Sequence, residues 1–102
     1  MSNKLAFLFV APSAVRGQHR TVFAMEGIDL VVSGVADYTQ AAEEARVLVA
    51  EGCSAIELCA GFGSTGVAAV VAAIRGAVPV GVVRFDAHPA LGYASGDTVF
   101  AG

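Results

Sequence analysis

Residues 55–71 read AIELCAGFGSTGVAAVV. An apolar run ends at Cys59, a glycine-rich turn extends from Gly61 to Gly66, and a run of small apolar residues begins directly after it. A short apolar run bounded by turn residues is typical of a buried strand, and the longer run after the turn is typical of a helix. The stretch therefore predicts a strand–turn–helix unit, the building block of sheets with parallel strands.

The rest of the chain alternates in the same way. We expect strands over residues 4–11, 29–35, 54–60 and 80–85, and helices between Asp37 and Gly52 and over residues 64–75. Segment 13–27 fits either a short helix or an extended strand that turns into the next one. The pattern predicts one α/β domain over residues 1–102, with a small, mostly parallel four-stranded sheet and helices packed on it, like a flavodoxin-like or Rossmann-like half.

The first helix has clear end signals. Asp37 and Gln40 form a capping-box pattern, and Gly52 stands where a glycine commonly ends a helix. Its buried stripe is expected to comprise Tyr38, Ala41, Ala42, Ala45, Leu48 and Val49, with Glu43, Arg46 and Glu51 facing solvent. The final segment, DAHPALGYASGDTVFAG (86–102), is too rich in glycine to predict a helix. We expect residues 87–102 to form a loop over the sheet edge or an arm onto a neighbouring subunit.

The chain is more apolar than a small globule can readily bury. Hydrophobic residues make up 56% of its 102 residues, and charged residues only 15%. Small domains have a high ratio of surface to volume, and large exposed apolar patches mark interfaces. The helix expected over residues 64–75 is apolar nearly all the way round, so it needs cover on both sides. We therefore expect a homodimer or higher oligomer with this helix at the subunit interface.

Charge and cysteine content narrow the choice of partners. The formal net charge is −3, and the six basic residues form no run or stripe, which argues against nucleic acid. The apolar runs are shorter than the ~18 residues of a membrane span, so we expect no membrane insertion. Cys53 and Cys59 lie too far apart on one extended strand to form a disulfide. Free thiols favour a cytoplasmic protein.

The turn matches the pattern G-x-G-x-x-G from Gly61 to Gly66. Asp86 follows after about 20 residues, the spacing of the acid that binds ribose in dinucleotide-binding folds. Against a dinucleotide, the motif follows the third expected strand instead of the first, and the chain supplies about one mononucleotide half. The glycines also fit a tight turn with close helix–strand packing. We favour an anion site formed by the backbone N–H groups of residues 63–65 at a helix N-terminus.

Ligands of parallel α/β sheets bind outside the carboxyl ends of the strands. The expected strand ends bring Ser13, Cys59 and His88 to one edge, and His19 lies in a loop that reaches the same edge. Cys59, at a helix N-terminus, is a candidate nucleophile or proton carrier, with His88 and Asp86 as further candidate catalytic groups. Alternatively, the cysteine is a small buried hydrophobe and the histidine only holds a loop.

Glu57 and Arg84 are charged residues within expected strands, where a charge is costly unless it is paired or functional. If their strands are neighbours they can form an ion pair, either structural or part of the site. No set of residues has the spacing of a metal site, so we expect no metal, and the sequence specifies no cofactor. The candidate ligand-binding residues are Ser13, Gly61, Gly63, Ser64, Thr65, Glu57 and Arg84.

Two segments, AIELCAGFG (55–63) and PVGVVRFDAHPALGYASGD (79–97), resemble a family of small uncharacterised bacterial proteins, known as a domain of unknown function, over essentially the whole chain. The turn Cys59-Ala60-Gly61 is also similar to one in the second half of the aspartate/glutamate/hydantoin racemases. Those enzymes use two cysteines on opposite sides of the substrate. This chain is about half their length and has Ser13 near the end of its first expected strand, so His88 or a residue of a second subunit would have to replace the missing base.

Three classes of function follow from these observations. The first is an oligomeric protein that binds a small anionic metabolite at the carboxyl ends of its strands. The second is a small enzyme of proton transfer, isomerase-like or racemase-like, that uses Cys59 and His88. The third is an assembly protein whose glycines and apolar helix serve packing alone. We favour the first class.

Overall fold

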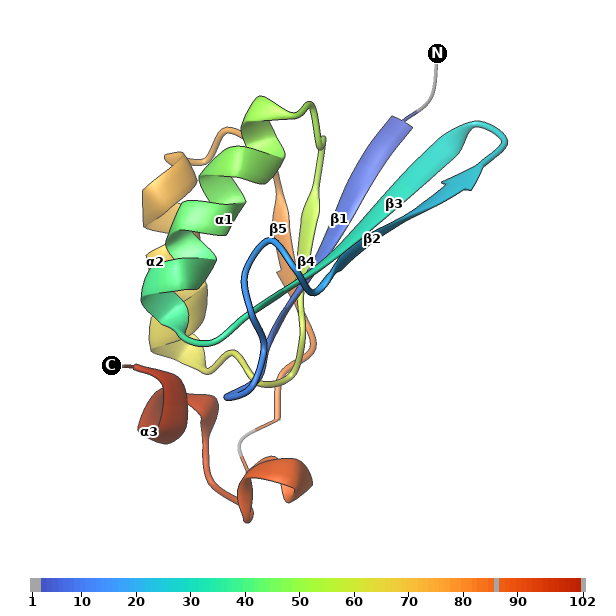
Figure 1. Ribbon diagram of the computed structural model, residues 1–102. Coiled ribbons are helices and arrows are strands. Elements are labelled where there is room, and N and C mark those ends of the chain that lie inside the picture. Colours follow the sequence, from blue (N-terminus) through green and yellow to red (C-terminus); the bar gives the residue numbers. More distant parts are fainter. Residues whose placement is uncertain (1–2, 86, 102) are drawn as a thin grey trace.

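The computed structural model describes residues 3–85 and 87–101, which form a mixed α/β domain around a five-stranded sheet (Figure 1). The elements in chain order are β1 (Asn3–Val10), β2 (Arg20–Met25), β3 (Ile28–Val35), α1 (Tyr38–Ala50), β4 (Ile56–Leu58), α2 (Ser64–Ile74), β5 (Val80–Val82), a 3-10 helix η1 (Pro89–Leu91) and α3 (Gly96–Phe100). The strand order is β2-β3-β1-β4-β5. The strands β3, β1, β4 and β5 run parallel, and β2 runs antiparallel to β3.

The prediction of four strands is wrong, because part of the unassigned segment 13–27 forms β2. This strand lies at the edge of the sheet, and its residues from Thr21 to Met25 are exposed on both sides. A strand that buries neither face has no alternation of apolar and polar residues, which explains why the sequence pattern did not separate it from a helix. Gly27, with φ of +82°, allows the short turn from β2 into β3.

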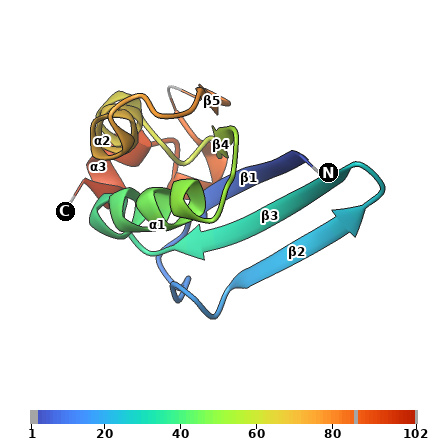
Figure 2. The same cartoon turned by 90° about the horizontal axis from the view of Figure 1, so that it is seen from above.

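Both long helices cover the same face of the sheet (Figures 1 and 2). The parallel strands β3-β1-β4-β5 stand in the order 2-1-3-4, as in flavodoxin-like sheets. Doubly wound folds have helices on both faces. Here the antiparallel strand β2 connects β1 to β3, where such folds have a helix, so the other face carries no helix in the part of the chain that the structure describes. The predicted mostly parallel α/β sheet is confirmed, whereas the flavodoxin-like half is not, because both long helices cover one face of the sheet.

The core lies between the sheet and these two helices. Along β1, Ala6, Leu8 and Val10 are buried against the helices, and the residues between them are half-buried on the open face. The largest fully buried hydrophobic side chains are Phe62, Leu8, Leu48, Ile56, Leu58, Val31, Val35 and Val70. The period-two burial of β1 therefore determines which face receives the helices.

Helix α1 begins and ends where its sequence signals predict. The carboxylate of Asp37 accepts the N–H of Gln40 at 2.8 Å, the side chain of Gln40 accepts the N–H of Ala36 at 2.9 Å, and Gly52 ends the helix with φ of +96°. The buried residues of the helix are Tyr38, Ala41, Glu44, Ala45 and Leu48. Four of the six predicted stripe residues are therefore buried, whereas Ala42 and Val49 are half-buried and the burial of Glu44 was not predicted.

Helix α2 ends at Ile74, one residue before the predicted end, because Arg75 adopts the left-handed conformation with φ of 53°. Its buried residues are Gly66, Val70 and Ile74, and its outer side exposes small apolar residues, with Val71 40% exposed. The strands β4 and β5 on either side of it have three residues each, fewer than predicted.

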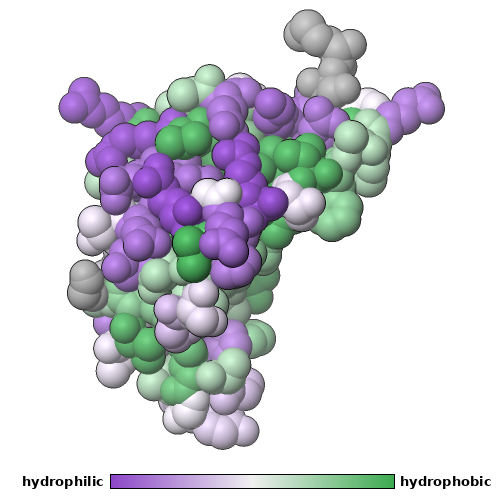
Figure 3. Space-filling model, in the orientation of Figure 1, coloured by the Kyte–Doolittle hydropathy of each residue, from purple (hydrophilic) through white to green (hydrophobic). Residues whose placement is uncertain are grey.

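The C-terminal segment contains a helix, so the prediction that it is too rich in glycine for one is wrong. The hydroxyl of Ser95 accepts the N–H of Asp97 and caps α3, and Phe100 is buried beside Tyr38, with ring centroids 6.3 Å apart. Residues 87–101 therefore fold back on their own chain below the sheet edge (Figure 1). Figure 3 shows hydrophilic side chains over α1 and more hydrophobic side chains below it, around this segment.

Candidate functional site

The carboxyl ends of β1, β3, β4 and β5 meet at one edge of the sheet, because these strands are parallel. Two loops and the C-terminal segment gather there (Figure 1). The loop after β1 contains Ser13, the turn after β4 runs from Cys59 to Gly63, and the chain after β5 leads to η1 and α3. The structure thus brings the three predicted segments to one edge.

The N-terminus of α2 holds a carboxylate that comes from the same chain. The backbone N–H of Thr65 donates to both carboxylate oxygens of Asp97, at 3.2 Å each. The hydroxyl of Tyr38 donates to Asp97 Oδ1 at 3.0 Å and accepts the N–H of Gly63 at 2.9 Å. Asp97 therefore lies where the sequence predicts a bound anion. Sequence reasoning missed this residue, because the contact joins segments that no local pattern connects.

Two glycines allow this close approach of α3 to the turn. A Cβ atom on Gly63 would lie 2.1 Å from Asp97 Oδ1, and a Cβ atom on Gly96 would lie 1.7 Å from the carbonyl oxygen of Gly61. Neither distance is possible between real atoms. The glycine-rich turn therefore serves close packing, as one of the alternative interpretations of the motif held, and what packs against it is the C-terminal segment.

The pKa values of two groups at this turn, the Tyr38 phenol and the Asp97 carboxyl, are shifted in opposite directions. Burial raises the pKa of the Tyr38 phenol to about 12, so it stays a hydrogen-bond donor at neutral pH. For Asp97, burial acts to raise the pKa, but hydrogen bonds from Thr65, Tyr38 and the N–H of Gly66 outweigh it and hold the pKa below its usual range. Asp97 is therefore ionised at neutral pH and bound as an anion.

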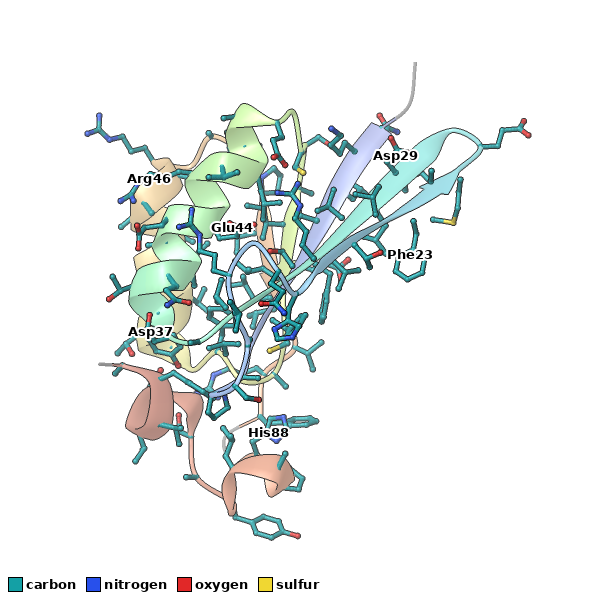
Figure 4. The ribbon with its side chains drawn as sticks, in the orientation of Figure 1. Phe23, Asp29, Asp37, Glu44, Arg46 and His88 are labelled. Atoms are coloured by element: carbon teal, nitrogen blue, oxygen red, sulfur yellow. The ribbon has the colours of Figure 1, made fainter. Side chains whose placement is uncertain are left out.

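Cys59 and His88 lie in different local environments. The sulfur of Cys59 is half-buried in the turn and accepts the N–H of Gly61 at 3.3 Å. His88 caps η1, with its Nδ1 accepting the N–H of Ala90 at 3.0 Å and its ring 5.1 Å from that of Phe85 (Figure 4). Among the described residues, no hydrogen bond joins Cys59 to His88. The third candidate catalytic group, Asp86, lies outside the described residues.

Ser13 lies in a small hollow of about 200 Å³ beside the end of β1. His19 lines the same hollow, and its Nδ1 accepts the backbone N–H of Val15 at 2.7 Å. His19 therefore shares a hollow with Ser13 whose lining does not include the turn after β4, and its Nδ1 already has a partner within its own loop.

Glu57 and Arg84 lie toward opposite faces of the sheet. Glu57 is exposed and lines a hollow on the open face, whereas the guanidinium of Arg84 donates to Ser64 on α2, at 3.4 Å, and to the carbonyl of Phe85. In the register of β4 and β5, the partner of Glu57 is Gly81. Arg84 follows the end of β5 at Val82, so the neighbouring strands do not place the two charges side by side as the predicted ion pair requires.

A third hollow, of about 490 Å³, lies between α1 and α2 and reaches the Asp97 site at Thr65. Its lining also includes Tyr38, Thr39, Glu43, Arg46 and Ala69. Its volume falls within the range of small-molecule sites. No pattern in the sequence indicates this hollow, because Arg46 has the spacing of an ordinary solvent-facing residue of an amphipathic helix.

Glu44 is a further charged residue that sequence reasoning missed. Only 3% of its surface is exposed, between α1 and the sheet (Figure 4). The hydroxyl of Ser33 donates to it at 2.7 Å, Nε of Arg16 donates at 3.0 Å, and Arg20 lies 3.8 Å away. These contacts fasten the loop after β1 and the start of β2 to helix α1. The available signal was its spacing from Ala41 and Leu48, which places it on the buried stripe.

Within residues 3–85 and 87–101, His, Cys, Asp and Glu side chains form no group of three or more that could hold a metal ion. No helix in the same ranges has the length and apolar character needed to cross a membrane.

The fold and the turn define a small α/β protein whose helix α2 holds an internal carboxylate at its N-terminus. Over residues 3–98 the chain matches a family of unknown function (DUF6506), and it belongs to this family. No curated protein and no solved structure matches it.

Proposed function

We propose that this chain is an oligomeric protein that binds the anionic group of a small molecule at the N-terminus of α2. The observation that carries this proposal is the Asp97 carboxylate held by the N–H of Thr65 and the hydroxyl of Tyr38. A turn that binds a carboxylate of its own chain has donors suited to a carboxylate or phosphate of a ligand. Asp97 then acts as an internal competitor, which the ligand displaces.

The surroundings supply room for the rest of such a ligand. The hollow between α1 and α2 begins at Thr65. Arg46 in its lining offers a second contact for negative charge, which Glu43 in the same lining partly offsets. Ser13 and the turn after β4 lie at the adjacent ends of β1 and β4, where the order of the parallel strands reverses. That position is the usual ligand crevice of open α/β sheets. We therefore favour a small metabolite with one carboxylate or phosphate at Thr65 and a second anionic group near Arg46.

The proton-transfer enzyme is the second candidate, and the hydrogen bond from Gly61 to Cys59 Sγ is the observation that favours it. Such an enzyme, like the racemases that the turn resembles, needs Cys59 and a second base on one substrate. The contacts described for the His88 side chain are with Ala90 and Phe85 instead. Binding without turnover is therefore the function we favour, in a cytoplasmic bacterial protein whose Cys53 and Cys59 are both free.

The test is an NMR titration of the 15N-labelled protein with inorganic phosphate and, separately, succinate. We expect the Thr65 amide to shift saturably, and Asp97→Ala to bind both anions at least about tenfold more tightly because it removes the competitor. Thr98→Ala, the exposed neighbour on α3, is the matched control and should bind like the wild type. Arg46→Ala should weaken succinate more than phosphate. If neither the wild type nor Asp97→Ala shows a saturable shift at Thr65, the turn is structural and the proposal fails.

A further inference from the structure

The face of the sheet opposite the helices is apolar and has no cover within the described chain. β1 contributes Leu5, Phe7 and Phe9, each half-buried. The neighbouring strands contribute Leu30 and Val32 on β3 and Phe23 and Met25 on β2, placed on this face by their register with β1. Phe23 is 52% exposed, and Figure 4 shows it pointing away from the helices. In Figure 2 the strands β2 and β3 extend beyond the helix layer.

The size of this face suits a dimer interface. The strands β1 and β3 have eight residues each, β2 has six, and β4 and β5 have three each. At ~3.3 Å per residue and ~4.8 Å between strands, they cover roughly 440 Å² in projection. The accessible area of a side-chain surface exceeds its projection, and a specific interface buries at least about 500 Å² on each partner. The face is therefore large enough for a small dimer interface.

A hollow of about 250 Å³ lies in the middle of the face, and an aromatic side chain projects at its edge. The hollow is lined by Leu5, Phe7, Leu30, Val32, Ala55 and Glu57. Phe23 on the edge strand is the projecting group. A hollow and a projection on one apolar face allow two copies to be complementary to each other, which is the requirement for a two-fold interface.

The strand registers give the positions of these groups along the sheet. Phe23 on β2 pairs with Leu30 on β3, which pairs with Leu5 on β1. On the other side of β1, Ala6 pairs with Ile56, so Leu5 lies beside Ala55. Phe23 and Ala55 therefore lie at the same position along the strand direction, that is, at one level. By the same registers, Thr21 lies level with Glu57, through Val32 and Phe7. A two-fold axis that runs parallel to the strands, between β1 and β3, places β2 of one copy opposite β4 of the other. Rotation about this axis leaves the position of each residue along the strand direction unchanged.

We infer that this face binds a second copy of the chain, sheet against sheet, about such an axis. Phe23 enters the hollow over the partner's Ala55, and Thr21 lies over the partner's Glu57. The hydroxyl of Thr21 then gives the partner's Glu57 a hydrogen-bond donor, which a carboxylate needs when an interface buries it. Symmetry makes each contact twice. This inference rests on the oligomer of the proposed function and specifies its surface, in place of the α2 surface expected from the sequence.

The experiment is sedimentation equilibrium of the wild type and three single variants, with circular dichroism to confirm that each is folded. We expect a wild-type dimer, which Phe23→Glu weakens at least about 30-fold, as for a central interface residue. Val22→Glu, the adjacent residue with 49% exposure and the opposite orientation, should keep the wild-type dissociation constant. Val71→Glu, on the exposed side of α2, should do so too. A dimer that resists Phe23→Glu but yields to Val71→Glu would refute this face and leave the oligomer intact.

A charge exchange tests the orientation of the two copies. Thr21→Glu should weaken the dimer by repulsion from the partner's Glu57, and adding Glu57→Lys to that variant should restore the wild-type dissociation constant. A failure to restore it would overturn the proposed axis. A wild-type chain that is monomeric at millimolar concentration would overturn both the face and the oligomer, while the NMR titration would still test the anion site independently.

Discussion

The backbone N–H of Thr65 donates to both carboxylate oxygens of Asp97, across 32 residues of sequence, at 3.2 Å each. This contact joins the N-terminus of α2 to the C-terminal helix α3. It gives the glycine-rich turn a defined partner and links ligand binding, as we propose it, to the position of the C-terminal segment. An anion that replaces Asp97 removes one of the contacts that hold α3.

Stability should depend on pH through Asp97. Its pKa is held below the usual range in the folded protein, so its contribution is present above the ordinary pKa of about 3.9 and is lost as the pH falls through the folded-state value. We expect the difference in the free energy of unfolding between the wild type and Asp97→Asn to be constant near neutral pH and to shrink below about pH 4. Urea unfolding at a series of pH values measures it. A difference that stays constant down to pH 2 would contradict the contact.

Gly63→Ala should displace Asp97, because the new Cβ would lie 2.1 Å from Asp97 Oδ1. We expect a loss of about 1–3 kcal/mol in the free energy of unfolding, which is typical of overpacking. In an Asp97→Ala background the same change should cost much less, since the clashing group is absent. Gly81→Ala is the control, because a Cβ there meets nothing within 4 Å and its φ is not in the left-handed range. Equal costs of Gly63→Ala in both backgrounds would exclude the clash as the cause.

The sequence was sufficient where a local pattern determines the structure. The alternation of β1, the cap at Asp37 and the glycine that ends α1 at Gly52 each act within a few residues, and these elements formed where they were predicted. Strand β2 lacks such a pattern, because an edge strand exposed on both sides has no buried face to mark. Helix α3 depends on its cap at Ser95 and on tertiary contacts of Phe100, which outweigh its glycine content.

The candidate site was predictable in position but not in its contacts. Parallel strands alone place Ser13 and Cys59 at one edge, so the location follows from topology. The role of Asp97 depends on the path of the C-terminal segment, which no periodicity reveals. The burial of Glu44 was not predicted either, because a glutamate on a helix ordinarily faces solvent. Its burial depends on Ser33 and Arg16, which come from other parts of the chain and donate hydrogen bonds to its carboxylate.

Glu44 should contribute more to stability than its neighbour in sequence. Glu44→Ala leaves the hydroxyl of Ser33 and the guanidinium of Arg16 without their acceptor, and the loss of one partner in a buried ionic contact typically costs about 3 kcal/mol. Glu43→Ala, at an exposed position 3.9 Å from Arg16, should change the free energy of unfolding by no more than about 0.5 kcal/mol. Urea unfolding of the two variants under identical conditions compares them. Similar values for both would show that the buried network adds no net stability.

The two thiols should react at different rates with a thiol reagent such as DTNB. Cys53 is only 2% exposed, and burial raises the pKa of its thiol, so little thiolate is present and access is poor. Cys59 is half-buried in the turn at the sheet edge and should react first. At pH 7.5 we expect one thiol per chain to react in a fast phase. Cys59→Ser should remove this phase, and Cys53→Ser should leave it in place. Succinate should slow this phase in Asp97→Ala if anions bind at the adjacent helix N-terminus. A fast phase that persists in Cys59→Ser would assign the reactive thiol to Cys53 and contradict its burial.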